Sequence, residues 1–306
     1  MFCRIGIGCA AIAGLWGCTR AIAPAPPLPP EPPEAQAEAS SLAPITYTTH
    51  EHPTSLVHVV TIPSGAGWQV GVAIADTLAP LPDLAAEVGA IAAINAGFFD
   101  PQNGLTTSYV TLNGALAADP RQNPRLIENP DLQAYLDAIL NRSEFRIYDC
   151  GGSVEYAIAP HTAPVAPGCR LDAAVGAGPQ LLPEMTGYAE GFLANNAAGE
   201  VVRDALGGRY GNARSAVGLK PDGTVVFVMA GQRLDAEGAT GLSFDELADF
   251  LRSLGVTTAL NLDGGSSSGL IYQGDAHYGR LNAERQPVLR PIKSILWVGD
   301  RRRQSD

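Results

Sequence analysis

The order of apolar and polar residues along the chain predicts many short β-strands. The segments SLVHVVTIP (55–63) and WQVGVAIA (68–75) run apolar or alternate, and both are rich in β-branched residues, which is typical of strands with buried faces. Further segments share this pattern: AIAAIN, TSYVTLNG, FRIYD, VEYAIA, AAVGAG, SAVGLK, TVVFVMAG and VTTALNL. A Pro-Asp-Gly turn joins SAVGLK to TVVFVMAG, so these two strands are expected to be neighbours.

Three segments instead carry helical spacing. LPDLAAEVG (81–89) has apolar residues on one face and stops at a glycine. Residues 129–140 open with Asn-Pro, which suits the N-cap and the first helical position, and then place apolar residues on one face. Residues 243–255 begin with the capping box S-x-x-E and end at a glycine. Strands outnumber helices and several connections are too short for crossovers. We therefore expect an α+β fold, a mixed and mostly antiparallel β-sheet with helices packed on it.

The first 18 residues have the composition of an export signal. Arg4 precedes an apolar stretch that is too short to span a bilayer as a helix; a chance apolar tail is the alternative. The stretch ends in LWGC, which resembles the lipobox of bacterial lipoproteins, and this resemblance implies lipidation of Cys18. We expect an exported, periplasmic or cell-surface protein that contacts the membrane only through this N-terminal lipid.

Composition then divides the rest of the chain. Residues 19–44 are rich in proline and predict an extended tether with little to bury. Residues 45–299 have the length of a single large domain, and 300–306 form a basic tail. The net charge of −11 repels phosphate polymers, so nucleic acid is excluded as a partner and an anionic substrate must be held by local cations.

Two of the five cysteines, Cys150 and Cys169, lie in the predicted domain. In an exported chain they predict one disulfide, with two free buried thiols as the alternative. Two cysteines do not make a cysteine-based zinc site on their own. The run His50-Glu51-His52 has no third spaced partner, and we interpret it as an exposed edge of the domain. We predict no metal and no other cofactor.

The stretch NLDGGSSS (261–268) carries the most specific chemistry. Asp263 follows a buried strand, and the backbone N–H groups of Gly264 and Gly265 can approach an anion closely. Ser266 and Ser267 offer hydroxyl donors to phosphate or sugar oxygens. The motif therefore predicts a binding turn with one carboxylate, and the alternative is a flexible Gly/Ser hairpin tip.

Five separated blocks resemble, in this order, the phosphodiester glycosidase family. They are INAGFFD, GAGPQLL, NARSAVGLKPDGTVVFVMA, GLSFDELADFLRSLGVTTALNLDGGSSSGLIY and RPIKSILWV. The resemblance covers nearly all of residues 45–299. It implies the fold of that family and an activity similar to its best known one, the removal of N-acetylglucosamine from a phosphodiester on lysosomal enzyme glycans.

Residues outside the Asp263 turn complete the predicted site. Arg214 matches the arginine of the family's Arg-x-Ala-x-Gly block, which implies a bidentate grip on phosphate; a surface ion pair is the alternative. Asn95 is expected to orient the sugar and Gly97 to let the backbone approach it, unless the amide only caps its own turn. Arg290 matches the arginine of the last block and is expected as a second phosphate contact.

These features together predict an exported glycosidase that hydrolyses a sugar-1-phosphodiester, with a carbohydrate or phosphoglycan as substrate. Asp263 would be the key carboxylate, while Arg214 and the two glycine amides hold the phosphate. One alternative is an O-glycosidase or lyase acting on polysaccharide, which needs a second carboxyl group such as Asp119 or Asp204. Another is a glycan-binding lipoprotein without activity. Arg203 is a further polar residue that could line the pocket.

Overall fold

The structure is a computed structural model, and it describes residues 43–65, 67–233, 235 and 240–301. The predicted export signal, the lipidation site at Cys18 and almost all of the proline-rich tether lie outside these residues. No helix within the described ranges is long and apolar enough to cross a membrane.

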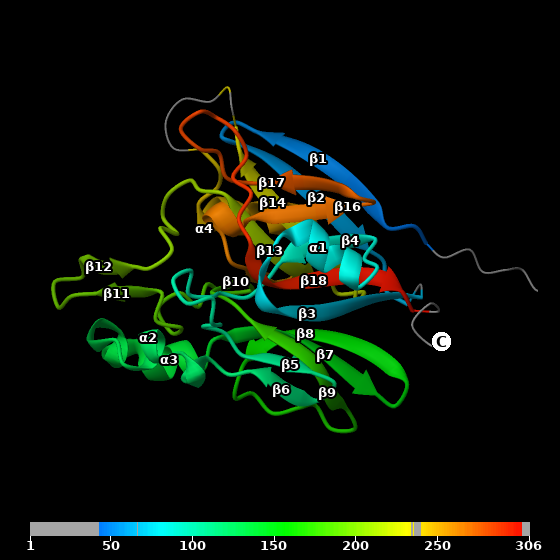
Figure 1. Ribbon diagram of the computed structural model, residues 1–306, viewed down its shortest axis with the longest axis horizontal. Coiled ribbons are helices and arrows are strands. Elements are labelled where there is room, and N and C mark those ends of the chain that lie inside the picture. Colours follow the sequence, from blue (N-terminus) through cyan, green and yellow to red (C-terminus); the bar gives the residue numbers. More distant parts are fainter. Residues whose placement is uncertain (1–42, 66, 234, 236–239, 302–306) are drawn as a thin grey trace, which may run out of the picture. The chain divides into compact units, whose positions relative to one another are not determined.

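Sheet I contains six strands in the order β1-β2-β14-β13-β15-β10 (Figure 1). Every neighbouring pair in it is antiparallel. The edge strand β1 carries His50 to His52, in agreement with their interpretation as a domain edge. The strands are β1 (Thr46–His52), β2 (Ser55–Ile62), β10 (Gln180–Leu182), β13 (Arg214–Leu219), β14 (Val225–Gln232) and β15 (Thr258–Asn261).

Sheet II contains five strands in the order β17-β16-β4-β18-β3, and its ladders are also antiparallel. The longest ladder joins the two ends of the domain, because β3 near the start pairs with β18 near the end. The strands are β3 (Trp68–Ala79), β4 (Ala92–Asn95), β16 (Gly269–Tyr272), β17 (Asp275–Tyr278) and β18 (Ile292–Asp300).

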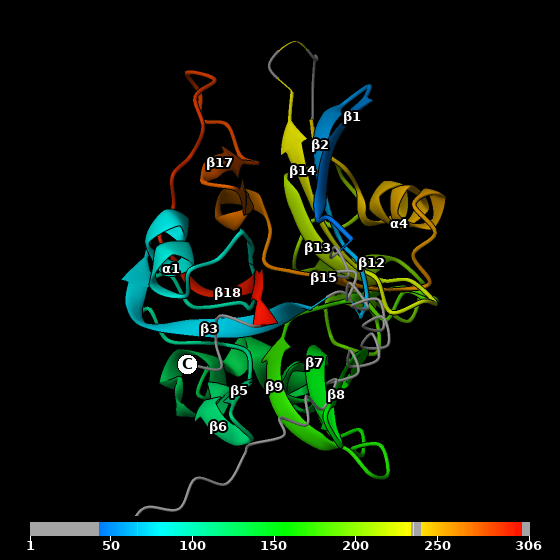
Figure 2. The same ribbon diagram turned by 90° about the vertical axis from the view of Figure 1, so that its right-hand side faces the viewer.

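Sheet III has the order β6-β5-β9-β7-β8, is again antiparallel, and occupies the lower part of the view in Figure 2. A separate two-stranded hairpin, β11–β12, precedes the return to sheet I. The strands are β5 (Val110–Leu112), β6 (Ala115–Ala118), β7 (Ser143–Cys150), β8 (Ser153–Pro160), β9 (Arg170–Gly176), β11 (Leu193–Asn195) and β12 (Val201–Asp204).

The helices are few and short. They are α1 (Leu81–Glu87), α2 (Pro124–Ile127), α3 (Leu136–Leu140) and α4 (Phe244–Ser253), with 3₁₀ turns η1 (Pro120–Gln122), η2 (Pro130–Tyr135) and η3 (Gly265–Ser267). The predicted capping box of α4 is confirmed, since Ser243 and Glu246 exchange both capping hydrogen bonds. Gly255 follows with a φ of 79°, the left-handed conformation that ends a helix.

Three apolar clusters hold these layers together. The largest draws buried residues from all three sheets, among them Val60, Leu296 and Phe145. A second packs α4 on the other face of sheet I, and a third packs α1 on sheet II. The expected α+β class is confirmed in broad terms, but the fold is dominated by strands. All ladders among the described strands are antiparallel, so the parallel part of the expected mixed sheet is not found there.

The helix expected over residues 129–140 is only partly correct. Its first half is the 3₁₀ turn η2, and only Leu136–Leu140 is α-helical. The Leu132 N–H bonds to the Asn129 carbonyl three residues back, and the Gln133 side chain also donates to that carbonyl. The side chain thus competes for the acceptor that an α-helical turn would give to the Gln133 N–H, which explains the tighter turn.

The predicted disulfide is confirmed. Cys150 at the end of β7 and Cys169 before β9 are bonded, with a sequence separation of 19. Replacing both residues by Ala is expected to lower the free energy of unfolding by about 3 kcal/mol, because the unfolded chain then regains the entropy of an open loop. Urea unfolding of the oxidised protein and of the double variant measures this difference. Equal unfolding midpoints would show that the bond does not stabilise the fold.

Candidate active site

The segment 262–268 carries the chain from sheet I to sheet II. It leaves β15 and enters β16, and these two strands pair with different neighbours. The Leu262 N–H donates to the Ser215 carbonyl of β13, and the Asp263 N–H donates to the Ala96 carbonyl just beyond β4, each at 2.8 Å. The alternative that this stretch is a hairpin tip is therefore wrong. It is a crossing between two sheets that places Asp263 where β4 and β15 end.

Asp263 has the environment of a functional carboxylate. Desolvation by the surrounding protein raises its pKa from 3.8 to about 6, although the Ser267 side chain, the charge of Arg290 and the Gly264 N–H oppose the shift. A carboxyl group whose pKa lies near neutral pH can exchange protons during a reaction. Such a shift, together with a nearby cation, is a physical mark of functional sites.

Arg290 provides the cation beside this carboxylate. Its Nη1 donates to the Ser266 hydroxyl at 2.7 Å, and its guanidinium lies 5.1 Å from the centre of the Phe99 ring. Asp263, Ser266, Ser267 and Arg290 are therefore brought together, as the sequence predicted. None of the ion pairs among the described residues involves Arg290, so its charge is available to an anionic ligand.

Asn95 supports the turn from below the surface. Its Nδ2 donates to the Asp263 carbonyl at 2.5 Å, while its Oδ1 accepts from Ser215 Oγ at 2.7 Å and from the Gly269 N–H at 3.0 Å. The residue is only 1% exposed. Asn95 is thus a positioning residue that fixes both ends of the turn, and the expectation that it contacts the sugar is not supported.

The two glycine amides bond within the protein and are not free for the phosphate that the sequence predicted there. The Gly265 N–H donates to the Ala213 carbonyl at 2.8 Å, and the Gly264 N–H bonds to the Asp263 side chain. The glycines are needed for conformation instead. Gly265 has a φ of 60°, and a Cβ at Gly264 would lie 3.2 Å from the Ala213 carbonyl.

Arg214 is also used differently from the prediction. Its guanidinium donates four hydrogen bonds to the backbone carbonyls of Leu242, Leu206, Gly207 and Tyr210, and it lies 4.5 Å from the centre of the Phe244 ring. The residue is 2% exposed, and burial lowers its pKa to about 10. Four of the five donors of an arginine are thus occupied. Arg214 braces the loops around the turn, and neither a grip on phosphate nor a surface ion pair describes it.

Gly97 serves close packing. A Cβ at position 97 would lie 3.0 Å from the Gly176 carbonyl oxygen. The Gly97 N–H donates to Ser294 Oγ at 2.9 Å. Ser294 also accepts the Ala96 N–H through its carbonyl. This serine on β18 therefore holds the end of β4 in place, and the lack of a side chain at Gly97 lets β4 and β9 approach each other.

The other polar candidates are engaged in local contacts. Asp119 accepts from the Arg121 side chain and caps η1, which lowers its pKa. Asp204 accepts from the N–H groups of Gly208 and Arg209. No hydrogen bond joins either carboxylate to the Asp263 turn within the described ranges. Arg203 lies on β12 and bonds to the Gly191 carbonyl.

Three residues with contacts near the turn were not predicted from the sequence as part of the site. Ser215 orients Asn95, as described above, and Asn261 donates from its buried side chain to the Gly178 carbonyl at 2.7 Å. Arg280 donates to Asn212 Oδ1 at 2.9 Å on the rim. Asn261 stands in the quoted motif and could have been singled out as a polar residue inside an apolar strand. The other contacts depend on distant segments that no local pattern connects.

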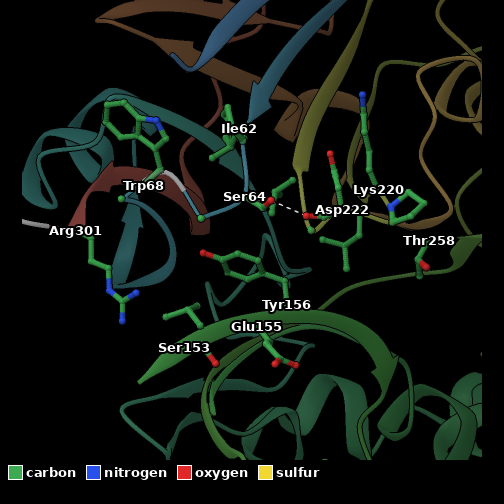
Figure 3. Close-up of a pocket in the computed structure, with 18 of the residues that line it drawn as sticks. Ile62, Ser64, Trp68, Ser153, Glu155, Tyr156, Lys220, Asp222, Thr258 and Arg301 are labelled. Carbon is green, nitrogen blue, oxygen red and sulfur yellow. Dashed lines mark hydrogen bonds between the residues drawn. The ribbon is translucent and has the colours of Figure 1, made fainter. Parts of the chain in front are cut away.

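A cavity lies elsewhere in the domain. It has a volume of about 710 Å³ and is lined by residues of the segments 62–65, 67–68, 152–156, 219–225 and 257–258 with Arg301. Tyr156 stands in its middle in Figure 3, with its hydroxyl accepting from the Val70 N–H, and Ser64 donates to the Asp222 carbonyl. No residue predicted for the active site lines this cavity.

Among the described residues, one cluster of side chains has the residue types and the spacing of metal ligands. It contains Cys150, Glu155 and Cys169. Both cysteine sulfurs are bonded to each other in the disulfide. A disulfide sulfur is not the thiolate that binds metals, so this cluster is not a metal site.

The fold of this chain is similar to that of solved structures. The catalytic domain of zebrafish N-acetylglucosamine-1-phosphodiester alpha-N-acetylglucosaminidase, auto-inhibited by its pro-peptide, is similar in structure with a TM-score of 0.63 and 15% identity, over 86% of this chain and 85% of that one. A hypothetical protein from Synechocystis is similar with a TM-score of 0.53 and 20% identity, over 83% of this chain and 61% of that one. At these identities the similarity establishes the fold.

The sequence itself establishes the family. The profile described as phosphodiester glycosidase matches residues 88–298, which is more than half of the chain. The chain belongs to the phosphodiester glycosidase family, as the resemblance of the five blocks implied. A search among curated protein sequences gives no match.

Proposed function

We propose that this protein is a hydrolase of sugar-1-phosphodiesters in which Asp263 is the essential carboxylate. The observation that carries this proposal is the desolvated carboxyl group, with its pKa raised to about 6, beside Arg290 at the junction of two sheets. Family membership and the similarity to a phosphodiester glycosidase domain support the same type of reaction.

The chemistry needs little more than this arrangement. The bond between C1 of the sugar and the phosphate oxygen breaks, and the phosphomonoester leaves with the electron pair. Water adds to C1 and gives up one proton. A phosphate leaves without strong general-acid help, so one anion at C1 and a cation at the phosphate are sufficient. Asp263 acts in its ionised form, as a base towards water or as the anion beside the oxocarbenium-like transition state, and Arg290 contacts the phosphate.

An O-glycosidase with a pair of carboxylates fits less well. The two candidates for a second carboxyl group, Asp119 and Asp204, are held by Arg121 and by backbone N–H groups. Acid catalysis of glycoside cleavage needs a protonated carboxyl group at the leaving oxygen. The pKa of Asp119 is lowered by its contacts with Arg121, which disfavours the protonated form.

The direct experiment is a panel of sugar-1-phosphodiesters that differ in the sugar, incubated with purified protein. We expect release of the free sugar and of a phosphomonoester from at least one of them. The same panel with plain aryl glycosides is the control, and we expect slower turnover there because the phosphate contact is lost. Cleavage of the plain glycosides alone would favour the O-glycosidase.

Activity is expected to depend on pH through Asp263. Since the ionised carboxylate is the active form, kcat/KM should rise with pH through about 6 and then level off. The rise lies well above the ordinary carboxyl range because burial disfavours the charged form. Rates measured from about pH 4.5 to about pH 8 test this. A profile that is flat or falls across this range would contradict the role of the ionised group.

The location in the cell belongs to the same proposal. The apolar N-terminal stretch and Cys18 support export and attachment by lipid to the membrane, with the domain on a proline-rich tether. A glycan or phosphoglycan of the cell envelope or exterior would then be within reach as substrate.

A further inference from the structure

Two arginines near the turn are held side by side by consecutive backbone carbonyls. Arg142, just before β7, donates from Nε to the Glu190 carbonyl at 3.2 Å. Arg203 on β12 donates from Nε to the Gly191 carbonyl at 2.8 Å. In each case the inner nitrogen is fixed, and no hydrogen bond within the described ranges reaches the terminal Nη atoms. The terminal nitrogens of both guanidinium groups therefore keep N–H donors that a ligand can use.

Aromatic rings fix the planes of these groups. The Arg142 guanidinium lies 3.7 Å from the centre of the Phe192 ring and 5.8 Å from that of Phe98. The Arg203 guanidinium lies 4.5 Å from the centre of the Tyr135 ring in η2. Figure 1 shows the β11–β12 hairpin beside the α2–α3 segment, and the contact of Arg203 with Tyr135 joins the two. Stacking of this kind orders an arginine before a ligand arrives and so reduces the entropy lost on binding.

The charges of the two arginines are only partly offset by the protein. Burial lowers the pKa of Arg142 to about 9; the charge of Glu190 opposes this, and the charge of Arg203 adds to it. The Glu190 carboxylate accepts from the Ser143 hydroxyl and from Thr186, and its charge offsets one of the two positive charges. Neither arginine takes part in an ion pair among the described residues. Two like charges in a chain with a net charge of −11 form a local site for an anion.

This pair of arginines is connected to the catalytic turn. Phe98, which contacts Arg142, follows the Ala96 carbonyl that binds the Asp263 N–H. On the other side, Gly178 bonds to Asn261 in both directions. A Cβ at Gly178 would lie 2.9 Å from Phe192, so this segment packs directly on the ring under Arg142. The rings that contact Arg142 thus pack beside the ends of β4 and β15, where Asp263 lies.

We infer that Arg142 and Arg203 form an oxyanion site that binds the phosphate group of the substrate on the leaving-group side. This inference rests on the proposed function and deepens it, because it replaces the contacts that Arg214 and the glycine amides cannot make. Two guanidinium forks match the oxygens of a phosphate bidentately, which a lysine does not. Arg290 would then contact the phosphate near the bond that breaks, while Arg142 and Arg203 hold its other oxygens.

Binding of inorganic phosphate tests the site without any assumption about turnover. Isothermal titration of the wild type is expected to show binding, and Arg142→Gln and Arg203→Gln should each weaken it about tenfold or more. Arg142→Lys keeps the charge but loses the forked guanidinium. Its affinity for phosphate should lie between those of the wild type and Arg142→Gln. Arg252→Gln is the matched control, since Arg252 is an exposed arginine of α4 paired with Asp249. Unfolding midpoints near the wild-type value show that the variants are folded.

Three results would overturn the inference. One is an unchanged phosphate affinity in folded Arg142→Gln and Arg203→Gln, and another is no phosphate binding by the wild type. The third is preferential binding of glucuronate titrated in parallel, which would assign the arginines to a sugar carboxylate.

Kinetics separate this inference from the proposed function. With a cleavable phosphodiester, the two Gln variants should raise KM about tenfold and change kcat by less than about threefold, because the contact is made in the ground state and the transition state alike. Turnover with unchanged KM in both variants would refute the arginine site and leave the hydrolase intact. Phosphate binding that depends on both arginines, in a protein that cleaves no member of the panel, would refute the hydrolase and leave the arginine site intact.

Discussion

Replacing Asp263 by Asn is expected to lower kcat about a hundredfold or more while KM changes by less than about threefold. The substitution keeps the shape of the side chain and removes the charge that acts in the transition state. It leaves the backbone contacts of the turn in place, because Asn95 and Ala96 bind the main chain of residue 263. Steady-state kinetics on any cleaved phosphodiester measure both constants.

The stability of the same variant provides its control. In the folded chain the pKa of Asp263 is about 6, above its ordinary value of 3.8. The stability linked to its protonated form is therefore complete below about pH 4 and lost as the pH rises through about 6. Near neutral pH the neutral Asn variant should be at least as stable as the wild type. A well-folded variant with near-normal kcat would end the catalytic assignment, whereas a destabilised one would show that the charge has a structural role.

Replacing Glu144 by Gln is expected to lower the free energy of unfolding by about 3 to 5 kcal/mol. Glu144 and Arg146 lie on β7 and are each 2% exposed, with the Arg146 Nε donating to the carboxylate at 3.0 Å. His161 Nδ1 bonds to the other carboxylate oxygen at 2.6 Å. Without the charge of Glu144, the buried guanidinium of Arg146 keeps only carbonyl and hydroxyl partners. An uncompensated buried charge is among the most destabilising changes known.

Urea unfolding compares this variant with Arg170→Gln, which breaks an exposed ion pair with Asp172 at the start of β9. We expect a loss below about 1 kcal/mol for that control, because solvent screens the pair. Similar losses in the two variants would mean that the pair on β7 is no stronger than a surface contact. The comparison is informative because both changes remove one partner of an ion pair from sheet III.

Local patterns predicted the elements well wherever neighbouring residues decide the structure. The capping box of α4 and the alternating strands need only neighbours in sequence, and they were found. Residues 129–140 differed because one side chain, Gln133, competes for a backbone acceptor. The position of Asp263 past a buried strand could also be predicted, since the apolar run and its end are visible in the sequence.

The partners of the site residues could not be predicted in the same way. Arg214 looks like a ligand-binding arginine until the carbonyls of the 206–210 loop and of Leu242 surround it. The Gly265 amide looks free until the Ala213 carbonyl reaches it. These acceptors come from segments whose placement depends on the whole fold. For the same reason Arg142, far from any recognised block, emerged only from the structure.

In the proposed reaction the protein breaks the bond between the sugar carbon and the phosphate oxygen with the help of Asp263. Hydrolysis in ¹⁸O-labelled water tests it most directly, with mass spectrometry of the phosphomonoester product. Water that attacks C1 leaves the bridging oxygen on phosphate, so the phosphomonoester is predicted to contain no ¹⁸O. Its formation should be about a hundredfold or more slower in Asp263→Asn. Incorporation of ¹⁸O into the phosphomonoester would show attack at phosphorus and contradict the glycosidase assignment.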